Sequence, residues 1–163
     1  MRFLAMIAVA VFLSTLAPQA RADMGEDCAQ ERDPDLSIGG CTVAIHSGEW
    51  QGTDLAWAYY NRGSAYDDLG DYRRALEDYD QALRLDPGDG SAYQNRGVSH
   101  ESLGEYARAA EDWERAIRIG GASRAEWWQK YMKGKGHYTG AIDGVFTPGL
   151  RRDLLACAID PAC

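Results

Sequence analysis

Basic residues are fewer than acidic residues in this chain of 163 residues. The sequence has 17 Lys and Arg and 25 Asp and Glu, which gives a net charge of −8. A surface of this sign disfavours sequence-independent binding to the phosphates of nucleic acids or to anionic membranes. Neither is therefore an expected partner.

Motifs for catalysis and for metal binding are also missing. The sequence contains no GxSxG, no HExxH and no glycine-rich loop that could hold a phosphate. The histidines, His46, His100 and His137, fall on different expected elements, and no CxxC motif accompanies them. Acidic side chains are plentiful, but on amphipathic helices they usually form a solvated face, and no pair of them stands out. We expect no enzymatic activity, no cofactor and no bound metal.

A long apolar run lies at the start of the chain, from Phe3 to Leu13, after the basic Arg2. The small-x-small sequence Ala20-Arg21-Ala22 follows it, an arrangement typical of a cleaved secretory signal peptide over residues 1–22. A retained membrane anchor is the alternative. The run is shorter than the ~20 residues needed to cross a bilayer, so we expect no stable membrane insertion after cleavage. The pattern predicts a bacterial protein that is periplasmic or secreted.

Cysteine is rare but even in number, and all four cysteines follow the expected cleavage site. In an exported protein this pattern indicates disulfides. Of the three connectivities that four cysteines allow, we favour Cys28–Cys41 and Cys157–Cys163, because each pair lies near one end of the chain.

Two stretches of the chain, residues 60–83 and 94–117, are nearly the same. Asn61-Arg62-Gly63 matches Asn95-Arg96-Gly97 at an offset of 34 residues, and the later matches keep that offset. This period is typical of a solenoid of helical hairpins. Gly63 and Gly97 lower the helix propensity, by about 1 kcal/mol each, so we expect a second helix to approach closely at these positions.

In these residues the chain resembles the tetratricopeptide repeat family, with one unit at 56–89 and a second at 90–123. The sequence departs from the family pattern at His100, where an aromatic residue is usual, and at Gly121, where proline is usual. Arg62 and Arg96 stand where the family usually has leucine. The positions that carry the resemblance are Tyr59, Gly63, Tyr66, Ala75, Tyr79, Ala82 and Pro87 in the first unit, and Tyr93, Gly97, Ala109, Trp113 and Ala116 in the second.

Two repeats are few for a stable array, so we expect the flanking segments to cap it. Residues 23–55 would form a disulfide-tethered cap with one helix from about Asp35 to Ser47. Residues 124–163 would supply a second capping helix, and Ser123 with Glu126 predicts its start as a capping box. The predicted fold is all-α: a short helical-hairpin solenoid with capping helices at both ends and a small helix–loop–helix tail.

The resemblance implies a concave groove that holds a peptide or protein segment. None of the stripe positions that would line it is basic, which disfavours capture of a C-terminal carboxylate and favours an apolar or mildly basic segment on Trp57 and Tyr60. The alternative is that these two rings pack under the N-terminal helix. The expected groove residues are Trp57, Tyr60, Asn61, Ser64 and Asp67 in the first unit, and Gln94, Asn95, Val98 and Glu101 in the second.

The tail resembles the peptidoglycan-binding-like domain of bacterial cell-wall proteins. Two positions depart from that pattern, Thr147 in place of glycine and Leu150 in place of threonine. The resemblance implies wall binding through Tyr138, Asp143, Phe146 and Arg151, or a purely structural tail. We expect Asp143 to form a turn and to pair with Arg151, before a helix from about Pro148 to Ile159. The matching residues are Gly136, Tyr138, Gly140, Ile142, Asp143, Gly144, Phe146, Pro148 and Arg151.

Taken together, these patterns predict a non-enzymatic scaffold that binds another protein or a peptide through its repeat groove. The alternative is an accessory module that binds peptidoglycan, in which the repeats support the tail.

Overall fold

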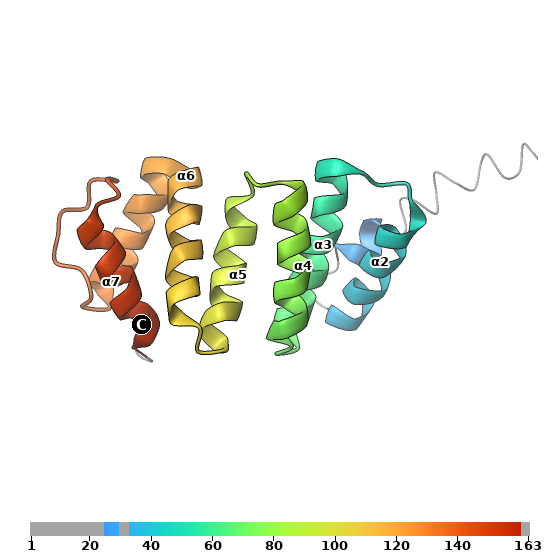
Figure 1. Cartoon of the computed structure of the whole chain (residues 1–163), viewed down its shortest axis with the longest axis horizontal. Helices are drawn as coiled ribbons and strands as arrows, with labels where there is room; N and C mark the ends of the chain where they lie inside the picture. The colour runs from blue at the N-terminus through green and yellow to red at the C-terminus, as the bar shows by residue number, and fades with distance from the viewer. Residues whose placement is uncertain (1–24, 30–32, 161–163) are drawn as a thin grey trace, which may run out of the picture.

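The computed structural model describes residues 25–29 and 33–160, and this part of the chain is helical without strands (Figure 1). The expected signal peptide and Cys163 lie outside it. The all-α solenoid predicted from the sequence is confirmed. After a helical turn at residues 25–28, the helices are α2 (Pro34–Ser47), α3 (Gly52–Asp68), α4 (Tyr72–Leu85), α5 (Gly90–Ser102), α6 (Tyr106–Gly134) and α7 (Pro148–Ile159).

The helices stand side by side in one row that runs from α2 to α7 (Figure 1). Each helix packs mainly against the helices that precede and follow it in the sequence. This is the arrangement expected of a solenoid, in which every hairpin covers the apolar face of its neighbour.

The two repeats are the hairpin of α3 with α4 and the hairpin of α5 with the first half of α6. Both hairpins turn at a left-handed glycine, Gly70 and Gly104, each with φ of 75°. The close helix approach expected at Gly63 and Gly97 is confirmed. A Cβ on Gly63 would lie 3.0 Å from the Tyr79 ring, and one on Gly97 would lie 2.6 Å from Trp113 Cδ1.

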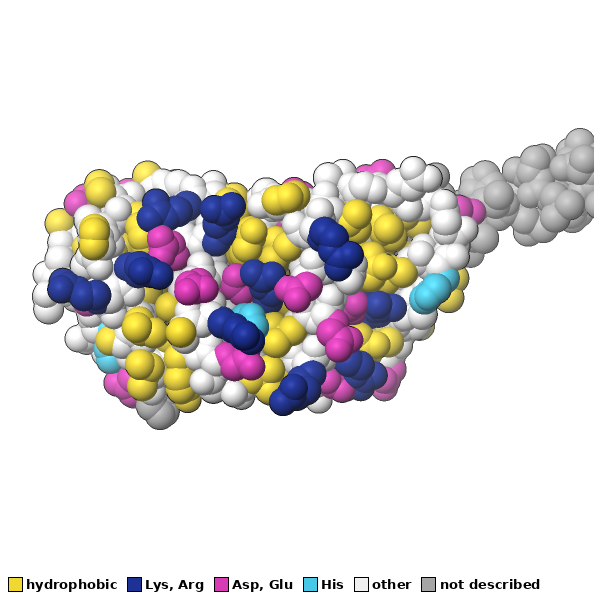
Figure 2. Space-filling view, viewed as in Figure 1, with side chains coloured by type: hydrophobic (Ala, Val, Ile, Leu, Met, Phe, Trp, Pro, Cys, Tyr) yellow, Lys and Arg dark blue, Asp and Glu magenta, His cyan; other side chains and the backbone are white. Residues whose placement is uncertain are grey.

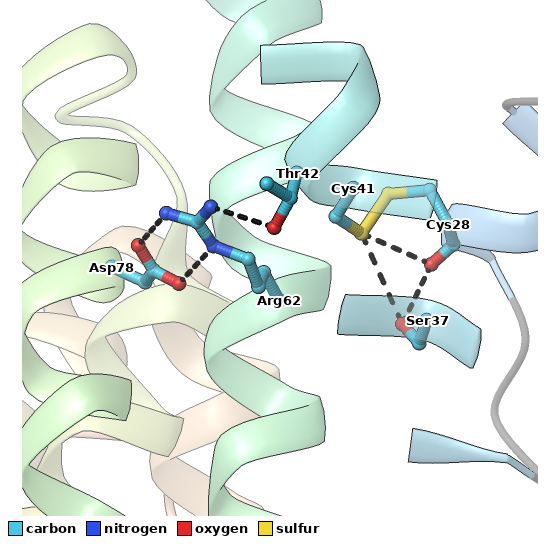
Figure 3. The surroundings of a disulfide bond; sticks show 6 residues. All are labelled: Cys28, Ser37, Cys41, Thr42, Arg62 and Asp78. Carbon is cyan, nitrogen blue, oxygen red and sulfur yellow. Dashed lines mark hydrogen bonds and ion pairs between the residues drawn. A yellow bond between two sulfur atoms is a disulfide. The ribbon is translucent and has the colours of Figure 1, made fainter. Parts of the chain in front are cut away.

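Arg62 and Arg96, which stand where the family usually has leucine, form the same ion pair in the two repeats. Arg62 donates two hydrogen bonds to Asp78, at 2.7 and 2.8 Å, and Arg96 donates two to Asp112, at 2.8 and 2.6 Å. Both carboxylates are buried. Two-pronged pairing satisfies each guanidinium inside the hairpin, so an arginine fits where leucine is usual. Arg62 also donates to Thr42 of α2 at 3.0 Å (Figure 3).

The N-terminal cap is held by the predicted disulfide Cys28–Cys41, which joins the helical turn at residues 25–28 to α2 (Figure 3). Ser37 reinforces this joint by donating a hydrogen bond of 2.9 Å to the Cys28 carbonyl. Asp33 caps α2 by accepting from the Leu36 amide at 3.1 Å, so the helix begins one residue before its expected start. The second expected disulfide, Cys157–Cys163, ends outside the described residues.

The C-terminal cap continues directly from the second repeat. The chain bends at Gly121, with φ of 61° and ψ of −151°, and Ser123 lies inside the helix that follows. The capping box expected at Ser123 is therefore wrong, because glycine provides the break two residues earlier and Glu126 pairs with Lys130 instead. Beyond the bend, α6 packs with α7 over one core, whose larger members are Trp113, Ile117, Trp128, Met132, Leu150 and Leu154.

Candidate peptide-binding groove

Two hollows lie along the expected groove stripe of α3 and α5. The first, which we name the N-terminal hollow, has a volume of about 420 Å³ and is lined by Trp57, Tyr60, Asn61 and Ser64 of α3 together with Cys28 and Ser37 of the cap. The second, the C-terminal hollow, has a volume of about 530 Å³ and is lined by Gln94, Val98 and Glu101 of α5, Trp127 and Tyr131 of α6, and Ile159 of α7. Volumes of this size are typical of ligand sites.

The rings of Trp57 and Tyr60 serve both the hollow and the scaffold. Trp57 packs against Trp50, with ring centroids 5.7 Å apart, and against the core under the disulfide. Tyr60 packs against Tyr79 at 6.0 Å, and its hydroxyl accepts a hydrogen bond of 3.2 Å from Asn95 Nδ2. This bond joins α3 to α5.

The Asp67 side chain forms hydrogen bonds between helices and does not line either hollow. Its carboxylate accepts hydrogen bonds from the Tyr79 hydroxyl at 2.8 Å and from Ser99 Oγ at 2.7 Å, which links α3, α4 and α5. Burial raises the pKa of Asp67 above its ordinary value, although both hydrogen bonds act in the opposite direction. The sequence did not single out Ser99, because a serine in a helix interior gives no signal of a partner on another helix.

Asn61 also lies at the N-terminal hollow, and its Nδ2 is buried without a hydrogen-bond partner among the described residues. A buried amide donor without a partner carries an unfavourable free energy until an acceptor reaches it. The backbone carbonyl of a bound segment is an acceptor of the required kind.

Glu101 is the charged member of the expected stripe in the C-terminal hollow. It is half-buried, and burial raises its pKa above the ordinary value of a glutamate. Gln94 binds Arg124 of α6 through its amide oxygen. The aromatic wall opposite is formed by Trp127 and Tyr131, which lie beyond the second repeat; their sequence pattern indicated only a capping helix.

The side chains expected to bind the cell wall all have partners within the tail and the second repeat. Tyr138 donates to the Ala141 carbonyl at 2.7 Å. Phe146 lies under the Arg118 guanidinium, whose central carbon is 4.7 Å from the ring centroid. Arg151 pairs with Glu114 at 2.7 Å, so the expected pairing with Asp143 is wrong.

Asp143 forms the expected turn, but a glutamine of α6 organises it. Asp143 accepts from the Val145 amide at 3.0 Å and from Gln129 Nε2 at 2.9 Å, and these bonds lower the pKa of its carboxyl. The Gln129 oxygen accepts in return from the amides of Asp143 and Gly144, both at 3.0 Å. Gln129 is fully buried, and it fixes the glycine-rich loop onto α6.

Other kinds of site find no support in the part of the chain that the structure describes. No group of His, Cys, Asp and Glu is placed to hold a metal ion there, and no helix there has the length and apolar character to span a bilayer. On the face shown in Figure 2, basic and acidic side chains are interspersed over most of the surface.

Models of the tetratricopeptide repeat match residues 56–89 and 90–121. Among solved structures, the crystal structure of MamA is similar, with a TM-score of 0.50 and 24% sequence identity over 79% of this chain. This similarity covers 66% of the MamA chain, and at such identity it concerns the fold alone. No curated protein sequence matches the chain. The chain therefore contains two tetratricopeptide repeats, which form the middle of its helical solenoid.

Proposed function

We propose that this protein is a non-enzymatic scaffold, periplasmic or secreted, that binds a peptide or protein segment along the inner stripe of α3 and α5. The observation that carries the proposal is that seven of the nine expected groove residues line one of the two hollows: Trp57, Tyr60, Asn61, Ser64, Gln94, Val98 and Glu101. The buried Asn61 amide adds a donor that an extended backbone can satisfy.

The location outside the cytoplasm is supported by the leader-like residues 1–22 and by the Cys28–Cys41 disulfide, a bond that persists in oxidising compartments. The alternative of a wall-binding module has less support. Tyr138, Asp143, Phe146 and Arg151 each have a partner inside the molecule, which suits a loop that is part of the scaffold.

The test is selection of peptides from a random-sequence display library on the oxidised protein, followed by affinity measurements on variants. Ser64→Arg and Val98→Arg each place a bulky cation in one hollow, and we expect the combined variant to weaken the selected peptides by about tenfold or more. Thr139→Arg combined with Val145→Arg is the control, because it adds the same two charges at exposed loop positions outside both hollows. Equal binding by the blocked variant and the control, or no selected peptide at all, would contradict the proposal.

A further inference from the structure

The C-terminal hollow contains a carboxylate without a partner. The Glu101 carboxylate makes no hydrogen bond and no ion pair with the described residues, and desolvation by burial is the cause of its raised pKa. A partly buried anion that lacks a counter-charge loses hydration without compensation. A cation that reaches Glu101 would compensate the carboxylate for its lost hydration.

The wall beside Glu101 suits a cation with an apolar stem. Trp127 and Tyr131 stack face to face, with planes 7° apart and centroids at 5.3 Å, and half of the Trp127 side chain is exposed. Ring faces of this kind attract ammonium and guanidinium groups. The chain's own Lys135 already lies 5.6 Å from the Tyr131 centroid. Val98 and Ile159, both exposed, extend the apolar surface for the stem of a long side chain.

The charges around the C-terminal hollow also favour a cationic ligand. Its lining includes Glu101 and Asp160 and no lysine or arginine. Asp160 pairs with His137 at 3.0 Å, and Arg124 is held at the edge by the Gln94 amide. Glu101 is thus the acidic group of the lining that is left for a ligand.

We propose that the C-terminal hollow binds a lysine or arginine side chain of an extended peptide segment, with the cationic head at Glu101, the stem along Val98, and the Trp127–Tyr131 pair stacked against it. The volume of about 530 Å³ also accommodates an apolar residue next to the cationic one. The preferred partner is thereby a basic, partly apolar segment, which also suits the acidic net charge of the chain.

This inference rests on the proposed peptide binding, and a substitution cycle tests it. A display-selected peptide that carries a Lys or Arg is compared with the same peptide carrying norleucine at that position, by calorimetry. For the wild-type protein we expect norleucine to lower the affinity about tenfold, because a charge-assisted contact is lost. For Glu101→Gln we expect little difference between the two peptides, since the anion is already gone.

Glu77→Gln is the matched control, because Glu77 is exposed on α4 and lies outside both hollows. It should retain the full discrimination between the two peptides. Trp127→Ala should weaken both peptides and lower the preference for the cationic one. Circular dichroism of Glu101→Gln is expected to match the wild type, because the substituted carboxylate holds no helix in place.

The outcomes separate this inference from the proposed function. Selected peptides that bind but share no basic residue, or a basic preference that Glu101→Gln leaves intact, would overturn the inference alone. Failure to select any peptide would overturn both. A dimer in light scattering that binds no peptide until it is diluted would place a second copy of the chain in the hollow, and that result also overturns the inference.

Discussion

Arg62 and Arg96 carry the same interaction in the two repeats, but their surroundings differ. Among the described residues, Arg62 has one carboxylate partner, Asp78; it also donates to the Thr42 hydroxyl and lies over the Tyr59 ring. Arg96 has Asp112 and, in addition, Asp80 at 2.6 Å. Removing the buried carboxylate should therefore leave Arg62 more poorly compensated than Arg96.

We expect Asp78→Asn to lower the free energy of unfolding by about 3 kcal/mol, because it leaves a largely buried guanidinium without an anion. Asp112→Asn is the matched variant in the second repeat and should cost less, since Asp80 remains. Urea unfolding followed by circular dichroism measures both. Equal losses, or losses below about 0.5 kcal/mol, would show that these pairs behave as surface ion pairs.

At the scale of single residues, the sequence predicted that a second helix approaches closely at Gly63 and Gly97, but it did not identify the ion-pair partner of Arg62. Gly63 and Gly97 could be interpreted because glycine destabilises a helix interior and is kept where another group must approach closely. In the structure that group is an aromatic ring of the next helix. The partner of Arg62 lies 16 residues away on another helix. Charged side chains on amphipathic helices are usually solvated, so the pattern gave no basis for choosing Asp78.

At the scale of elements, the N-terminal cap depends on a short cross-link. The buried cluster under α2 consists of Cys28, Cys41, Ala44 and Ala58, with Trp57 and Trp50 packed at its side. These are mostly small side chains, so the cluster provides little apolar burial. The disulfide closes a loop with a sequence separation of 13, which stabilises such a segment by about 3 kcal/mol on the chain-entropy estimate.

The double substitution Cys28→Ser with Cys41→Ser should therefore release the cap before the repeats unfold. We expect the tryptophan emission to shift to the red at a urea concentration below the main loss of helix, because Trp50 and Trp57 become hydrated. The N-terminal hollow, which includes Cys28, should lose its peptide affinity in parallel. A single transition at the wild-type midpoint would mean that packing alone holds the cap.

Element boundaries were predictable where a chemical signal coincided with the helix end. Pro148 marks the start of α7, with Thr147 as its cap, and the expected range of α7 agrees with the structure. The bend in α6 was misplaced, because the Ser123 and Glu126 pattern satisfies the capping rule although Gly121 makes the turn. The capping pattern and the glycine both predicted a helix boundary there. The break lies at the glycine because glycine adopts a positive φ without strain.

At the scale of the whole molecule, both hollows lie where a repeat meets a segment outside the repeats. The stripe of α3 is completed by the disulfide-tied cap, and the stripe of α5 by the far part of α6 and by α7. The repeat pattern predicted the stripes from the sequence. It could not predict the opposite walls, because these depend on how non-repeating segments pack, and Trp127 and Ile159 were therefore missed as groove residues.

We expect the tail to be required for folding, because α7 completes a core that it shares with the second repeat. Leu150 and Leu154 of α7 are fully buried against Trp113, Trp128 and Met132. Burying each leucine stabilises the fold by about 2 kcal/mol, so their joint loss removes a large share of the 5–15 kcal/mol of a typical domain. We expect a chain that ends at Gly134 to bind a hydrophobic dye and to unfold without a sharp transition.

Leu154→Ala is the milder version of this change, and it should lower the free energy of unfolding by about 2–5 kcal/mol while the helices remain. Val145→Ala, at an exposed position of the tail loop, is the control and should leave stability within about 0.5 kcal/mol. If the shortened chain unfolds as sharply as the full chain, the tail is a separate module. Removal of the tail would then take the α7 residues away from the C-terminal hollow and leave the repeats folded. Binding of the tail to peptidoglycan would regain support.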